Sequence, residues 1–133
     1  MIYADSSALV KLVIEEPESR DLKSFLDDYP TTPVVSCALA RVEVVRSVRI
    51  ADATLVAEAL AVCADLDVMA MTDELLAEAR DVAPRLLGTI DAIHLASAKR
   101  IAGRAGLTAF VAYDDRLLEA AGAAGLPTQS PGA

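Results

Sequence analysis

Four acidic residues stand at positions where a purely structural carboxylate is unexpected. Asp5 and Asp114 each follow directly on a short apolar run that has the composition of a buried strand. Glu43 and Asp91 stand inside segments with helical periodicity and have apolar neighbours. Carboxylates that converge in a fold repel one another, and they stay ionised only when a cation holds them. If the fold gathers these four acids, they form a cation site.

The chemistry of such a site follows from its ligands. Sites with oxygen ligands alone favour hard ions, Mg²⁺ or Mn²⁺, which keep several water molecules and share the phosphate oxygens of a substrate. An ion of this kind activates water and neutralises the charge that develops during phosphodiester hydrolysis. Each acid also has a local structural explanation, as a helix cap, a dipole partner or a turn residue. Only the joint pattern indicates catalysis.

The elements that must position the acids alternate between strands and helices. Apolar runs predict strands at 2–4, 34–37, 67–71 and 107–113, with a short edge strand at 126–128. Helical patterns cover 8–14, 39–50, 53–64, 73–82, 89–103 and 117–123, and a further helix starts near Pro17. This alternation predicts an α/β fold, a three-layer sandwich with a mostly parallel central sheet of four to five strands.

The predicted topology brings the acids to one edge of the sheet. The strands are continuous apolar runs, as expected where helices cover both faces. Right-handed crossovers place all strand carboxyl ends along one edge, where α/β proteins bind their ligands. We expect a single domain over residues 1–133, with a frayed tail at 128–133.

Composition limits the classes of function. The 133 residues carry a net charge of −8, which argues against generic binding of polyanions, and five aromatic residues are too few for an extended base-stacking platform. Cys37 and Cys63 lie in apolar patterns and are expected to be buried, reduced thiols. No apolar run approaches the roughly 20 residues of a membrane span, and no secretory signal is seen. We therefore expect a cytoplasmic protein without a membrane partner.

Four segments together resemble the PIN-domain family, and in size and pattern its VapC-like ribonuclease toxins of type II toxin–antitoxin pairs. The segments are 3–12, 40–44, 91–96 and 111–117. The resemblance implies a PIN-like fold and an Mg²⁺- or Mn²⁺-dependent endoribonuclease, with Asp5, Glu43, Asp91 and Asp114 as metal-binding and catalytic acids. It also implies an RNA substrate, a homodimer and a cognate VapB-like antitoxin.

Two further residues are assigned supporting roles by the same resemblance. The first motif of the family ends in a hydroxyl residue, which Ser7 matches, with Ser6 as the alternative. A second hydroxyl, often found two places before the last acid, is replaced here by Ala112. Asp115 follows Asp114 directly and either assists or substitutes for it.

Basic residues near the acids are candidates for RNA contacts. Lys11, Arg41, Arg46 and the sole histidine, His94, lie in the segments that carry the acids. One interpretation is a rim that binds phosphate groups, and the other is solvated helix faces with a packed histidine. The spacing of Arg46, three residues after Glu43, also allows these two side chains to pair.

Two other classes of function share parts of this pattern. A receiver-like phosphoacceptor domain has acids at strand ends, but it needs an acid after a middle strand. The segment 69–72 reads Met-Ala-Met-Thr and supplies none. A catalytically inactive PIN-like binding module is the third class, and the intact set of four acids argues against it.

Overall fold

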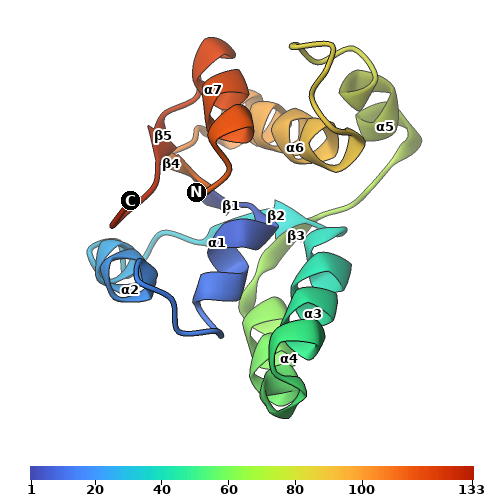
Figure 1. Cartoon of the computed structure of the whole chain (residues 1–133). Helices are drawn as coiled ribbons and strands as arrows, with labels where there is room; N and C mark the ends of the chain where they lie inside the picture. Colours follow the sequence, from blue (N-terminus) through green and yellow to red (C-terminus); the bar gives the residue numbers. More distant parts are fainter.

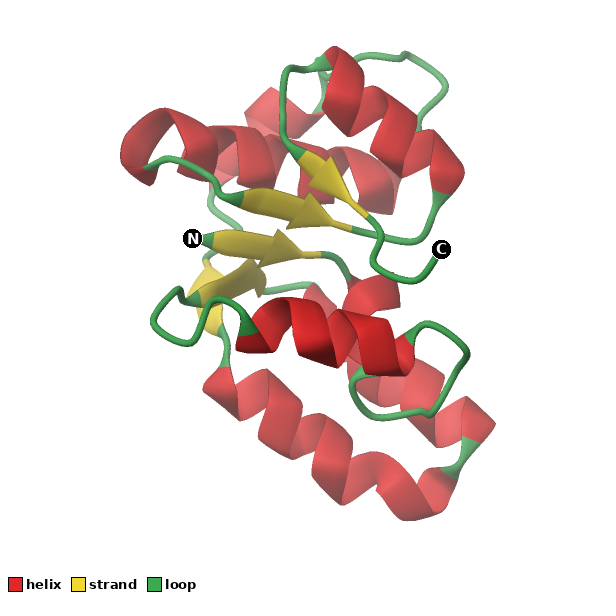
Figure 2. Ribbon diagram, turned by 90° about the vertical axis from the view of Figure 1, so that its left-hand side faces the viewer, coloured by secondary structure: helices red, strands yellow, loops and turns green.

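A parallel sheet with helices on both faces forms the frame of the molecule. The computed structural model describes residues 1–133. The strands are β1 (Ile2–Ala4), β2 (Val34–Cys37), β3 (Asp67–Met69), β4 (Ala109–Val111) and β5 (Thr128–Gln129). They lie in the order β3-β2-β1-β4-β5, and every neighbouring pair is parallel. Figure 2 shows the strand arrows pointing in one direction. The predicted three-layer α/β sandwich is confirmed, and its sheet is entirely parallel.

The helices divide between the two faces of the sheet, as Figure 1 shows. One face is covered by α1 (Ser6–Lys11), α2 (Ser19–Asp27), α3 (Ala40–Ala51) and α4 (Val56–Asp65), with the 3₁₀ turn η1 (Ala53–Leu55) between the last two. The other face is covered by α5 (Asp73–Ala79), α6 (Thr89–Ala105) and α7 (Asp115–Ala123). No helix is both long enough and apolar enough to cross a membrane.

Strand β1 divides the core into two parts because its side chains alternate between the faces. Ile2 and Ala4 pack with α1, α3 and α4, whereas Tyr3 packs with α6 and α7. All three residues are at most 4% exposed. The strand is therefore buried on both faces, which explains its uninterrupted apolar sequence.

The order of the strands creates a switch point beside β1. The chain leaves β1 toward β2 and β3 on one side and later returns to β4 and β5 on the other. A crevice forms at the carboxyl ends of the strands where such a sheet reverses direction, and ligands bind there in α/β folds. Asp5 follows β1 at this point, and its backbone N–H donates to the carbonyl of Val111 in β4 over 3.1 Å.

The structure corrects several predicted boundaries. Helix α1 starts at Ser6 instead of residue 8, because the Asp5 side chain caps it. The strand expected at 107–113 pairs only over Ala109–Val111. At the carboxyl terminus β5 pairs with β4, and the Tyr113 hydroxyl donates to the carbonyl of Pro131 over 2.7 Å.

Candidate active site

Each of the four acids lies at the amino-terminal end of a different helix. Asp5 and Asp114 are the N-cap residues of α1 and α7, and Glu43 and Asp91 lie in the first turns of α3 and α6. Because α1, α3 and α7 follow parallel strands and α6 runs back toward the start of β4, all four helices begin at the carboxyl edge of the sheet. Helix amino termini carry partial positive charge, which favours carboxylates there.

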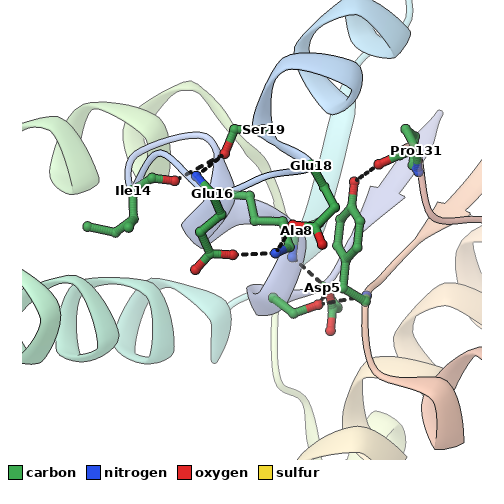
Figure 3. A network of polar contacts seen from close by, with 10 residues as sticks. Asp5, Ala8, Ile14, Glu16, Glu18, Ser19 and Pro131 are labelled. Carbon is green, nitrogen blue, oxygen red and sulfur yellow. Dashed lines mark hydrogen bonds and ion pairs between the residues drawn. The ribbon is translucent and has the colours of Figure 1, made fainter. Parts of the chain in front are cut away.

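Asp5 is the most buried of the four acids, with 4% exposure. Its Oδ1 accepts hydrogen bonds from the Ser7 hydroxyl at 2.6 Å and from the Ala8 backbone N–H at 3.0 Å, as Figure 3 shows around Asp5. Neither of these two bonds involves Oδ2. Burial raises the pKa of Asp5, although these two hydrogen bonds act in the opposite direction. The site thus holds a carboxylate at a cost in solvation that a cation would offset.

Ser7 links the turn that carries Asp5 to the loop that carries Asp114. Its hydroxyl donates to Asp5 and accepts from the backbone N–H of Tyr113 at 2.9 Å. Tyr113 immediately precedes Asp114. One side chain therefore connects the turn after β1 with the loop after β4, two segments that each carry an acid.

Glu43 is held by two donors from other elements. The Ser6 hydroxyl donates to Oε2 at 2.9 Å, and His94 Nε2 lies 2.7 Å from Oε1. The predicted pairing of Arg46 with Glu43 is wrong. The Arg46 side chain is exposed and forms no ion pair, because Ser6 and His94 occupy the Glu43 carboxylate.

Asp91 and Asp114 form the more open side of the crevice. Partial burial, followed by repulsion from Asp114, raises the pKa of Asp91, and Glu43 adds to this repulsion. Asp114 is exposed, and its Oδ1 caps α7 by accepting from the Leu117 N–H at 2.9 Å. The direction of this shift places Asp91 within electrostatic range of acids from α3 and α7. Asp115 is exposed, lies in the first turn of α7 and makes no side-chain hydrogen bond.

The donor set suits a hard cation that is bound partly through water. No group of three or more His, Cys, Asp and Glu side chains is arranged in this structure so that it could hold a metal ion by itself. Mg²⁺ typically binds proteins through one or two carboxylates and retains its other waters, so it does not need such a cage. The Oδ2 of Asp5 and the mutual repulsion at Asp91 fit an ion of this kind.

Lys11, which the sequence predicts as an RNA contact, is held by two glutamates in the structure. It is 9% exposed and pairs with Glu16 and with Glu18, the latter at 2.8 Å. Its amine also lies 4.7 Å from the centre of the Tyr113 ring. Figure 3 shows Glu16 and Glu18 turned toward this position. The lysine fixes the segment after α1 and cannot reach a phosphate without breaking these contacts.

His94, which the sequence also predicts as an RNA contact, has a side chain that is only 1% exposed. The ring lies beneath the crevice and contacts Tyr3 and Glu43. Arg41 and Arg46 remain candidates, since both are exposed on α3 and neither forms an ion pair.

Two residues of the site were not selected from the sequence. Tyr3 was assigned to a strand core and Ser6 was mentioned only as a substitute for Ser7, yet both belong to the hydrogen-bonded groups around Glu43. The adjacent hydroxyls in Asp5-Ser6-Ser7 are the one signal that pointed to Ser6. A tyrosine inside a short apolar strand gives no such signal.

Comparisons with known proteins agree with this fold. The sequence profile of the PIN domain matches residues 2–123. Ribonuclease VapC47 of Mycobacterium tuberculosis is 39% identical over 136 residues, covering 100% of this chain and 98% of that protein. Ribonuclease VapC35 of the same species is 39% identical over 132 residues, covering 99% and 98%. The crystal structure of M. tuberculosis VapC20, a Sarcin-Ricin loop cleaving toxin, superposes with a TM-score of 0.73 at 18% identity, covering 98% of this chain and 100% of that one.

Proposed function

This chain belongs to the PIN domain family, and we propose on that basis that it is a metal-dependent endoribonuclease, the toxin of a VapBC-type pair. The observation that supports the proposal is that Asp5, Glu43, Asp91 and Asp114 each lie at the amino-terminal end of a helix that begins at the carboxyl edge of the sheet. Relatives that align over the full length of the chain are named ribonucleases, which supports RNA hydrolysis as the reaction.

The four acids would hold Mg²⁺ or Mn²⁺, directly or through water. Such an ion supplies activation of water and neutralisation of charge on the scissile phosphate. The chain itself contributes orientation: Ser7 fixes Asp5, while Ser6 and His94 fix Glu43. Asp91 and Asp114 repel each other when both are ionised, which favours the uptake of a cation between them. Asp115 is an additional acid at the open side.

RNA would approach over α3. Arg41 and Arg46 are exposed there, on the same helix as Glu43, and are free to bind phosphates. With a net charge of −8, the chain needs such local cations and the metal to attract RNA. This contact accounts for affinity, and it leaves the choice of RNA target to the shape of the crevice.

The same proposal includes a homodimer and a VapB-like antitoxin. Val42 and Ile90 directly precede Glu43 and Asp91 and are 55% and 47% exposed. Apolar side chains beside an acidic crevice suit a partner that covers it. We place the action of the protein in the cytoplasm, where such a partner and cellular RNA are present. Light scattering on the purified protein, alone and with a small DNA-binding protein encoded beside its gene, tests both assemblies.

The decisive experiment compares the wild type with Asp5→Asn on a pool of cellular RNAs. The asparagine keeps an oxygen that can cap α1 and removes only the charge, so the fold is preserved. Cleavage by the wild type with Mg²⁺ or Mn²⁺, and none with chelator or with Asp5→Asn, is the expected result. Equal cleavage by a folded Asp5→Asn protein would refute the metal site. Intact RNA under every condition would favour the inactive binding module, and uptake of phosphate from a small phosphodonor the receiver-like alternative.

A further inference from the structure

A buried chain of hydrogen bonds links the sheet to Glu43 through the sole histidine. The Tyr3 hydroxyl lies 2.8 Å from His94 Nδ1, and His94 Nε2 lies 2.7 Å from Glu43 Oε1. Tyr3 is fully buried and His94 is 1% exposed. Both ring nitrogens thus have partners, which is what a buried imidazole requires. The Cys37 sulfur also lies 3.6 Å from Nδ1.

The direction of these hydrogen bonds follows from the Glu43 carboxylate, which lies at their end. An ionised carboxylate only accepts hydrogen bonds, so Nε2 of His94 carries a proton and donates it to Glu43. The contacts of the ring keep it in this orientation. It meets Tyr3 edge-on, with centroids 5.9 Å apart and planes at 82°, and Tyr3 stacks on Phe110 at 5.4 Å.

The hydrogen bonds from Tyr3 through His94 to Glu43 join two helices that lie on opposite faces of the sheet. Glu43 belongs to α3 and His94 to α6, and Figure 1 shows the sheet between these helices. Asp91 lies three residues before His94, on the same side of α6. The hydrogen bond from His94 to Glu43 therefore sets the position of Glu43 relative to Asp91, which comes from a different layer.

We propose that His94, braced by Tyr3, is a positioning residue that fixes the Glu43 carboxylate toward Asp91 before a cation binds. This role rests on the metal site of the proposed function. Residues that orient metal ligands from behind typically contribute about 10–100-fold to metal affinity or activity. The Ser6 hydroxyl holds the other oxygen of Glu43 at 2.9 Å, so both oxygens are oriented from the protein side.

The test measures Mn²⁺ binding by calorimetry without RNA, together with kcat and KM for cleavage. His94→Leu removes the donor at similar bulk, and we expect it to weaken Mn²⁺ binding about 10–100-fold and to lower kcat with KM for RNA unchanged. His94→Gln retains an N–H that can reach Glu43 and is expected to restore most of the loss. A purely structural role predicts instead that all variants keep the Mn²⁺ affinity of the wild type once folded.

Two controls make the result decisive. Tyr3→Phe keeps the stacked ring and removes only the hydroxyl, so it tests the support that Tyr3 gives His94 even if His94→Leu fails to fold. We expect Tyr3→Phe to lose less Mn²⁺ affinity than His94→Leu, and an unchanged affinity would overturn the role of Tyr3.

Because the polypeptide has one histidine, its ¹⁵N-resolved imidazole NMR signals belong to His94 alone. A proton on Nε2 that shifts in Glu43→Gln supports the inference, and an unprotonated Nε2 overturns it. Absence of Mn²⁺ binding by the wild type would refute the metal site itself, whereas equal binding by the wild type and folded His94→Leu would refute only the role of His94.

Discussion

The hydroxyl of Ser7 offers a sharp test of how the crevice is built. Ser7→Ala removes a bond to the buried Asp5 carboxylate and deprives the Tyr113 N–H of its acceptor. A hydrogen bond to a charged group is worth about 1.5–3 kcal/mol, and a partly buried donor left without a partner costs about 1–3 kcal/mol. Because both groups retain some access to water after relaxation, we expect a total loss of about 2–4 kcal/mol in the free energy of unfolding.

Urea unfolding followed by circular dichroism measures this loss. With an m-value of about 1.5 kcal/mol/M, the midpoint falls by about 1.3–2.7 M at unchanged m. Ser6→Ala is the matched control: it removes one bond to Glu43, which is less buried than Asp5 and which His94 still holds, so its loss is about 1.5 kcal/mol, the low end of the range for bonds to charged groups. A loss for Ser7→Ala below about 0.5 kcal/mol, or equal to that of the control, would refute the assigned bridge.

The pH dependence of the unfolding free energy separates the loss of the Ser7–Asp5 bond from the loss of the acceptor for the Tyr113 N–H. The Ser7 hydroxyl lowers the pKa of Asp5 against the larger, opposite effect of burial. Its bond to the carboxylate therefore contributes most when Asp5 is ionised, and the contribution declines as the pH falls through the pKa of Asp5. The difference between wild type and Ser7→Ala should narrow in acid to the part due to Tyr113. A difference that widens in acid would contradict this account.

Three other predictions concern Lys11, Asp91, and the arginines of α3. Lys11→Met should lower the urea midpoint by less than Ser7→Ala and leave RNA affinity unchanged, because Lys11 pairs with glutamates; weaker RNA binding in a filter assay would contradict this. In chelator, Asp91→Asn should gain stability over the wild type as pH rises above about 4, since burial and Asp114 raise the pKa of Asp91 and its ionised form opposes folding. Added Mn²⁺ should then raise the melting temperature of the wild type more than that of Asp91→Asn, and equal shifts would argue against Asp91 as a ligand. Replacing Arg41 and Arg46 by Gln should weaken RNA binding and flatten its salt dependence by about 0.7 per lost phosphate contact, and an unchanged slope would exclude α3 as the contact surface.

The sequence by itself determined the layers of the fold and the positions of the acids along the chain. Continuous apolar strands alternating with helices specify a parallel sheet, because such strands need cover on both faces. Parallel strands with right-handed crossovers then bring the residues that follow each strand to one edge. This local logic selected Asp5 and Asp114 as the residues that follow strands. Glu43 and Asp91 were selected as acids among apolar neighbours in helical segments, and the structure shows both in the first turn of a helix.

Only the tertiary structure decided what the polar residues around the acids contact. Lys11 and His94 lie near the acids in sequence, as Arg41 and Arg46 do, yet Lys11 pairs with Glu16 and Glu18 and His94 is buried between Tyr3 and Glu43. These partners lie on other elements or loops, and the direction of a long side chain depends on which of them the fold brings near. The physical reason is that burial and pairing are properties of the assembled packing, whereas helix and strand periodicity are properties of the chain alone.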